Sequence, residues 1–171
     1  MTEPNYRHAV QAAYRMRDKY STGRAWFDPF IVPTVEQRVK VCRYSTFCEK
    51  HGLDLLDFLR YVSTDGFTLR RGREYIIVYN DSPRIGEPRR RFTLAHELGH
   101  YALGHKRDGD EAEEDEADCF ARNLLAPRRV ALEHGLDFAD YPKVFGISAA
   151  AARMCERWQE MDEEYGIEPI K

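Results

Sequence analysis

The residues with the clearest capacity for chemistry are five in a row, His96-Glu97-Leu98-Gly99-His100. Residues four apart on an α-helix lie on the same face, so the two imidazoles can bind one Zn²⁺ ion together. Glu97 directly follows the first histidine, where it can accept a proton from a water molecule that the metal has acidified. The pattern H-E-x-x-H also occurs by chance in helices, so its surroundings decide whether it is catalytic.

A catalytic zinc site needs a third protein ligand and an open fourth position. His105 is one candidate, but it does not fit the pattern H-E-x-x-H-x-x-G-x-x-H, in which the glycine and the last histidine are seven and ten residues past the first. Here Gly104 is eight and His105 is nine residues past His96. On a continuing helix His105 would point roughly 180° away from His96. We therefore expect His105 to end the helix rather than to bind the metal.

The other candidates are carboxylates of the next, strongly acidic segment: Glu111, Glu113, Glu114, Glu116 and Asp118. Most carboxylates in such a run form a solvated helix face. Glu114 and Asp118, however, share a helical stripe with apolar residues such as Ala117 that must face the core. We expect Glu114 to be the third ligand, with Glu116 and then Glu113 as alternates. Asp118, one turn after Glu114, is expected to accept the N–H of a ligating histidine.

The segments RFTLAHELGHYALGH (91–105) and EDEADCFARNLLAP (114–127) resemble the ImmA/IrrE family of metallopeptidases. That family typically shows R-F-T-x-A-H-E-x-x-H, followed by E-x-x-A-N/D-x-F-A-x-x-L-L-M-P. This chain departs from the closing L-L-M-P at Ala126, where the family has methionine. The difference is a change in packing and leaves the polar residues of both motifs intact.

The resemblance implies a gluzincin-like peptidase in which His96, His100 and a glutamate bind zinc and Glu97 is the base. By position, the family's glutamate falls on Glu114. The resemblance also implies regulatory proteolysis, because members of the family cut helix-turn-helix repressors of the Xre type, often from genes on mobile elements or in stress-response operons. The alternative is a non-hydrolytic, repressor-binding or toxin-like module of a two-gene pair. The intact Glu97 argues against this, since a purely structural zinc site has no use for a base.

Peptide hydrolysis also needs a donor that stabilises the developing oxyanion. Tyrosine and histidine are the usual residues, and the sequence leaves four candidates open: Tyr101, His105, His134 and Tyr141.

Hydrophobic periodicity predicts helices at 6–20, 35–50 and 53–62, followed by two strands around a turn at Arg71-Gly72. The strand Tyr75–Tyr79 is dense in aromatic and β-branched residues. It is expected either to be an edge strand that receives an extended substrate or to be an ordinary core strand.

The helix that carries H-E-x-x-H is expected to follow a loop over 80–90, with Thr93 as its N-cap and Gly104 at its end. The acidic segment should continue as one helix to Pro127, and Ser148 should cap the last helix of the tail. This order predicts an α+β fold, namely a mainly helical, zincin-like domain. A small antiparallel sheet of about three strands should lie beside the H-E-x-x-H helix.

The chain has 171 residues and a formal net charge of −3. We expect residues 1–127 to form the peptidase domain and residues 128–171 to form a helical tail packed on it. Residues 143–158 resemble part of a helix-turn-helix, but the acidic balance argues against nucleic-acid binding. The sequence has neither an apolar run of the ~20 residues that a membrane helix needs nor the apolar core of a signal peptide, which predicts a cytoplasmic protein. The scattered cysteines are expected to be free thiols.

Overall fold

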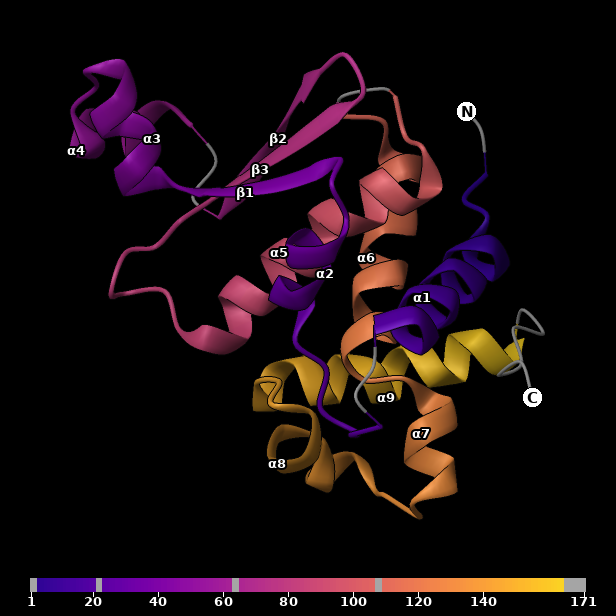
Figure 1. Ribbon diagram of the computed structural model, residues 1–171. Helices are drawn as coiled ribbons and strands as arrows, with labels where there is room; N and C mark the ends of the chain where they lie inside the picture. The colour runs from indigo at the N-terminus through magenta and orange to yellow at the C-terminus, as the bar shows by residue number, and fades with distance from the viewer. Residues whose placement is uncertain (1–2, 21–22, 63–64, 107–108, 165–171) are drawn as a thin grey trace.

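Two helices that lie side by side form the centre of the fold (Figure 1). The first, α5 (Glu87–Leu103), carries the H-E-x-x-H residues, and the second, α6 (Glu111–Leu125), carries the acidic segment. Gly99 allows their close approach, because a Cβ atom at this position would lie 3.1 Å from the Cα atom of Ala117. The structure is a computed structural model that describes residues 3–20, 23–62, 65–106 and 109–164.

The helix α1 (Tyr6–Tyr20) packs against α6 and confirms the helix predicted at 6–20. Its buried face includes Arg17. The Arg17 guanidinium donates a hydrogen bond of 2.9 Å to the carbonyl of Leu124, in the last turn of α6. It also donates to the carbonyls of Arg24 and Ala25, which follow α1. Arg17 therefore joins the last turn of α6 to the end of α1 and the segment that follows it.

A mixed sheet with the strand order β1-β3-β2 lies against one side of α5 (Figure 1). Its strands are β1 (Val39–Arg43), β2 (Gly66–Arg71) and β3 (Glu74–Tyr79). The predicted hairpin of β2 and β3 is confirmed, but β1 pairs with β3 in parallel, so the sheet is mixed rather than antiparallel. β3 contains Tyr75–Tyr79 and is the central strand, so the expectation that this segment is an edge strand is wrong and the core-strand alternative holds.

The helix predicted at 35–50 is wrong at its centre, where residues 39–43 form β1. Its second half is helical, as α3 (Tyr44–His51). Val39, Val41 and their neighbours pair along β3 from Tyr75 to Tyr79. The alternation of β-branched and polar residues in VKVCR fits a strand as well as a helix, and a partner distant in the sequence decides between the two.

The start of α5 also differs from the prediction. The helix begins at Glu87, after Gly86, and it has Pro88 in its first turn, so Thr93 is not its N-cap. Instead, the hydroxyl of Thr93 donates to the carbonyl of Arg89 one turn earlier. The predicted end at Gly104 is confirmed, with a left-handed backbone at φ 71°.

Arg91, about one turn into α5, is buried and connects the helix to two other parts of the chain. Its guanidinium donates to the carbonyl of Phe27 at 2.6 Å and to the carbonyls of Phe145 and Gly146 at 2.9 and 2.6 Å. It also lies over the ring of Trp26. The arginine that opens the R-F-T motif therefore positions the helix and does not reach the candidate ligands.

The tail packs beneath α5 and α6 in Figure 1, and its last helix is α9 (Ala149–Glu164). Ser148 caps this helix as predicted, because its Oγ accepts the backbone N–H of Ala151 at 3.0 Å. The division of the chain between residues 127 and 128 stays a prediction. The remaining helical elements are Pro29–Ile31 (η1), Val32–Val35 (α2), Leu55–Tyr61 (α4), Arg128–Glu133 (α7), Phe138–Asp140 (η2) and Tyr141–Phe145 (α8).

In the described part of the chain, no helix combines the length and the apolar character needed to span a membrane. None of the four cysteines is in a disulfide, which agrees with the expected thiols: Cys42, Cys48, Cys119 and Cys155.

Candidate active site

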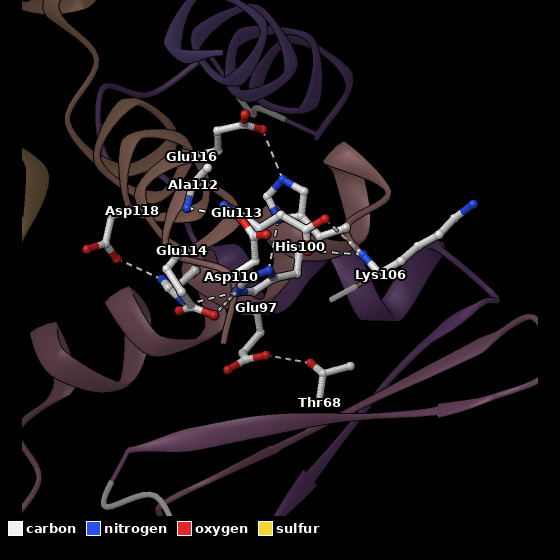
Figure 2. A network of polar contacts seen from close by, with 12 residues as sticks. Thr68, Glu97, His100, Lys106, Asp110, Ala112, Glu113, Glu114, Glu116 and Asp118 are labelled. Atoms are coloured by element: carbon white, nitrogen blue, oxygen red, sulfur yellow. Dashed lines mark hydrogen bonds and ion pairs between the residues drawn. The ribbon is translucent and has the colours of Figure 1, made fainter. Parts of the chain in front are cut away.

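The structure brings three of the predicted residues together between α5 and α6 (Figure 2). His96 and His100 lie one turn apart on α5, with their Nε2 atoms 3.0 Å apart. Glu114, in the first turn of α6, faces both of them. Its Oε2 lies 3.3 Å from Nε2 of His96, and its Oε1 lies 3.6 Å from Nε2 of His100. The two Nε2 atoms and the Glu114 carboxylate form the corners of a triangle, which we call the donor triangle, and one donor atom from each residue lies within 4.8 Å of the other two.

The triangle fits a zinc ion. A tetrahedral site with ligand bonds of 2.0–2.1 Å places neighbouring donor atoms about 3.3 Å apart. The two Nε2 atoms are 3.0 Å apart, and each lies 3.3 or 3.6 Å from the nearer oxygen of the Glu114 carboxylate, which is close to that value. Two imidazole nitrogens and one carboxylate oxygen also suit zinc better than calcium or magnesium, which prefer oxygen ligands alone. Three protein donors leave a fourth position for a reacting molecule.

Asp118 lies where the sequence predicted it, behind His96. Its Oδ1 is 2.7 Å from Nδ1 of His96. Since a carboxylate accepts, the imidazole carries its proton on Nδ1 and leaves the Nε2 lone pair for a metal. In helix α6, Asp118 is one turn beyond Glu114, so a single helix face presents both a candidate ligand and the carboxylate that contacts the candidate ligand His96.

A second and longer chain of contacts supports His100, and the sequence did not reveal it. Nδ1 of His105 lies 2.9 Å from Nδ1 of His100, and Nε2 of His105 lies 3.0 Å from Oε2 of Glu116. The Glu116 carboxylate accepts, so a neutral His105 carries its proton on Nε2 and accepts the Nδ1–H of His100. The lone pair of His100 Nε2 is thereby directed into the donor triangle.

The alternate ligands lie elsewhere. Glu116 contacts the buried ring of His105 and accepts the backbone N–H of Asn5, so it faces away from the metal position. Glu113 accepts the backbone N–H of Lys106 at 3.1 Å, which holds the chain after α5 against the start of α6. His105 follows the end of α5 at Gly104, as expected, and its two ring nitrogens contact His100 and Glu116. That His105 is not a ligand stays a prediction. Its buried position, with 5% of the residue exposed, gives it the additional contact with His100.

The protonation of the two histidines differs sharply when no metal is bound. Burial lowers the pKa of His96, but the hydrogen bonds to Asp118 and Glu114 outweigh this effect and raise it to about 10. Burial and the nearby charge of His96 lower the pKa of His100 to about 4. At neutral pH His96 is therefore a charged imidazolium and His100 is neutral, so a metal that binds the pair displaces the extra proton of His96.

Glu97 lies beside the triangle and points toward β2 (Figure 2). Its Oε2 accepts the hydroxyl proton of Thr68 at 2.6 Å, which leaves Oε1 free of that contact. Burial raises the pKa of Glu97, although the hydrogen bond from Thr68 opposes the shift. The close passage of β2 over α5 makes this contact possible: at Gly66 a Cβ atom would lie 2.5 Å from Cγ2 of Thr93. No pattern in the sequence singled out Thr68.

A cleft of about 550 Å³ opens over these residues, with β2 along one side and α5 along the other. In the described part of the chain, its lining includes none of the four predicted oxyanion donors. Tyr101 packs edge-on against the ring of Tyr75, and Tyr141 is buried against Phe138 and Phe145.

Arg70 does line the cleft. It lies on β2, two residues after Thr68, so it brings a positive charge to the same wall.

Replacing His105 with alanine is expected to weaken zinc binding by about 10- to 100-fold, the usual cost of losing a partner of a ligating histidine. Without His105, the proton of His100 is no longer held on Nδ1. A competition titration against a chromogenic chelator measures this effect. Glu116→Gln should weaken binding in the same direction, whereas Glu111→Gln, an exposed change on the same helix, should not. Equal zinc affinity in His105→Ala and the wild type would contradict the role assigned to this contact.

The comparison with known families agrees with this geometry. The model of the IrrE N-terminal-like domain, Peptidase M78, matches residues 48–154. No match was found among curated proteins or solved structures. The matched segment contains the donor triangle, Glu97 with its partner Thr68, and the residues behind both histidines. Because the match covers more than half of the chain, the protein belongs to the IrrE N-terminal-like (M78) family of peptidases.

Proposed function

We propose that this family member is a zinc-dependent endopeptidase and that it cuts a helix-turn-helix repressor of the Xre type. The observation that carries the enzymatic part is the position of Glu97 next to the His96–His100–Glu114 triangle, with one of its oxygens held by Thr68. A structural zinc site would have four protein ligands and no base beside them. The buried, oriented carboxylate instead suits proton transfer during hydrolysis.

The residues of the site have separate roles in the proposed hydrolysis. When bound, zinc supplies Lewis-acid chemistry that polarises the scissile carbonyl and acidifies water. Oε1 of Glu97 accepts the proton of the attacking water and returns it to the leaving amine nitrogen. Thr68 keeps the carboxylate in place through Oε2. Arg70, at the wall of the cleft, supports negative charge on the substrate oxygen more readily than the four residues expected from the sequence.

The substrate is proposed to lie in extended form along β2. β2 forms an outer strand of the sheet and lines the cleft, whereas β3 is paired on both sides. An extended peptide can add to such an edge through main-chain hydrogen bonds. This binding mode needs a segment of the repressor that is locally unfolded or linker-like. We also propose that the enzyme acts in the cytoplasm, where a DNA-bound repressor is accessible.

Incubating the purified, zinc-loaded protein with a repressor encoded by a neighbouring gene tests the proposal. Mass spectrometry of the products should reveal cleavage at a defined bond, and chelation of zinc should stop it. Tight binding of the repressor without cleavage would favour the alternative function, a non-hydrolytic binding module. Neither binding nor cleavage of that repressor, together with hydrolysis of other peptides, would overturn the proposed substrate and leave the peptidase assignment intact.

A further inference from the structure

A second cavity lies directly beside the catalytic cleft and has no role in the mechanism described above. It has a volume of about 560 Å³, within the range of about 300–1,000 Å³ that is usual for ligand pockets. It lies between α5, α6 and α9 and is open to solvent on one side. Its walls are mainly apolar and include the following side chains: Phe92, Leu125, Ile147, Ala151, Met154 and Trp158. We refer to this space as the apolar cavity.

The apolar cavity and the catalytic cleft adjoin each other. Asp65, Phe92, Thr93 and Asp118 line both of them. Asp118 is also the residue whose Oδ1 contacts His96 at 2.7 Å, so the cavity begins one side chain behind a proposed zinc ligand. A peptide whose carbonyl reaches the donor triangle must therefore place a neighbouring side chain at the entrance of the cavity, because adjacent residues of an extended chain rise only about 3.3 Å.

The charged groups around the apolar cavity are already engaged. Arg89 forms a two-point ion pair with Asp65 at the entrance, with distances of 2.6 and 2.8 Å. Arg122 lies over the ring of Trp158, 4.9 Å from its centroid, and contacts Sγ of Cys119. A charged side chain entering the cavity would find its potential partners occupied and would lose its hydration. An apolar side chain would only exchange water for hydrocarbon contacts.

We propose that the apolar cavity is the specificity pocket of the peptidase and that it takes one large apolar side chain, such as leucine, methionine or phenylalanine, next to the scissile bond. This inference rests on the proposed peptidase function. It also gives α9 a function, since this helix forms the far wall of the cavity. In a hydrophobic pocket a single methylene changes kcat/KM by about 10- to 200-fold, so a leucine-to-alanine change in the substrate should cost at least that much.

The test is cleavage-site profiling of a proteome-derived peptide library by mass spectrometry. The wild type should cut with a strong preference for a large apolar residue at one position beside the cleaved bond. Ala151→Trp, which fills the apolar cavity, should shift that preference to alanine, glycine and serine without changing the zinc content. Ala150→Trp is the matched control, because Ala150 is the exposed neighbour on the same helix. Ala151→Leu, a smaller addition, should give an intermediate shift, and thermal unfolding curves verify that each variant is folded.

The outcomes separate the two claims. Cleavage without an apolar preference, or an unchanged preference in folded Ala151→Trp and Ala151→Leu, would overturn the specificity pocket and leave the peptidase function standing. If the apolar cavity binds something other than a substrate side chain, the cleavage preference of these two variants should likewise stay unchanged. Absence of any cleavage by the zinc-loaded wild type would overturn the proposed function, and the pocket assignment with it.

Discussion

Glu97→Gln is expected to reduce the kcat of peptide cleavage by about 10²- to 10⁴-fold, the range that a positioned general base contributes. The amide cannot accept a proton from water, yet it has nearly the same size as the carboxylate. It can also keep the hydrogen bond with Thr68, since its carbonyl oxygen accepts the hydroxyl proton as Oε2 does. The variant should therefore fold normally and bind one zinc ion per chain. Initial rates on a quenched fluorescent peptide, together with metal analysis, measure both properties.

Thr68→Val provides a graded companion to this variant. It removes the hydroxyl that orients Glu97 but leaves the carboxylate, so its rate should fall between those of the wild type and Glu97→Gln. Cleavage by zinc-loaded Glu97→Gln at the wild-type rate would show that another group transfers the proton.

Glu114→Ala is expected to cause the largest loss of metal. A ligand is removed outright, so the zinc affinity should fall by more than the roughly 100-fold upper range for residues that only support a ligand. Glu113→Ala is the matched control, because Glu113 is the preceding carboxylate of α6 and contacts the backbone of Lys106 instead of the triangle. Zinc content after dialysis against a weak chelator should be near zero in the first variant and close to wild type in the second.

The same pair of variants also tests the choice between ligands. Full zinc retention in Glu114→Ala combined with loss in Glu113→Ala would reverse the assignment. The zinc affinity of Glu116→Gln should lie between those of Glu114→Ala and Glu113→Ala, because Glu116 affects the metal only through His105 and His100. An intermediate affinity in that variant would fit the supporting role that the contacts give to Glu116.

Local sequence information was sufficient to predict contacts between site residues that follow the regular spacing of a helix. The four-residue spacing of His96 and His100 and the helical stripe through Glu114, Ala117 and Asp118 predicted which side chains meet, and the structure brings them together. The small residues at the crossing point, Gly99 and Ala117, explain why these spacings suffice: the helices pack so closely that a side chain of α6 reaches the histidines of α5.

Contacts between segments far apart in the sequence could not be predicted in this way. The segment that forms β1 was expected to be helical from its local hydrophobic spacing. The pattern could not reveal the strand, because the partner strand β3 lies more than thirty residues later. Thr68 meets Glu97 only because β2 crosses α5 at Gly66. The spacing rule predicted that His105 is not a ligand, but it could not show that the turn after Gly104 folds the imidazole back onto His100.

X-ray absorption at the zinc edge of the wild-type protein tests the central claim most directly, namely that His96, His100 and Glu114 form an open zinc site beside Glu97. The account predicts one zinc ion per chain with nitrogen and oxygen neighbours at about 2.0–2.1 Å, two of them imidazoles, and one position filled by solvent. Sulfur neighbours at about 2.3 Å, a closed set of four protein ligands, or a protein that does not bind zinc would contradict it.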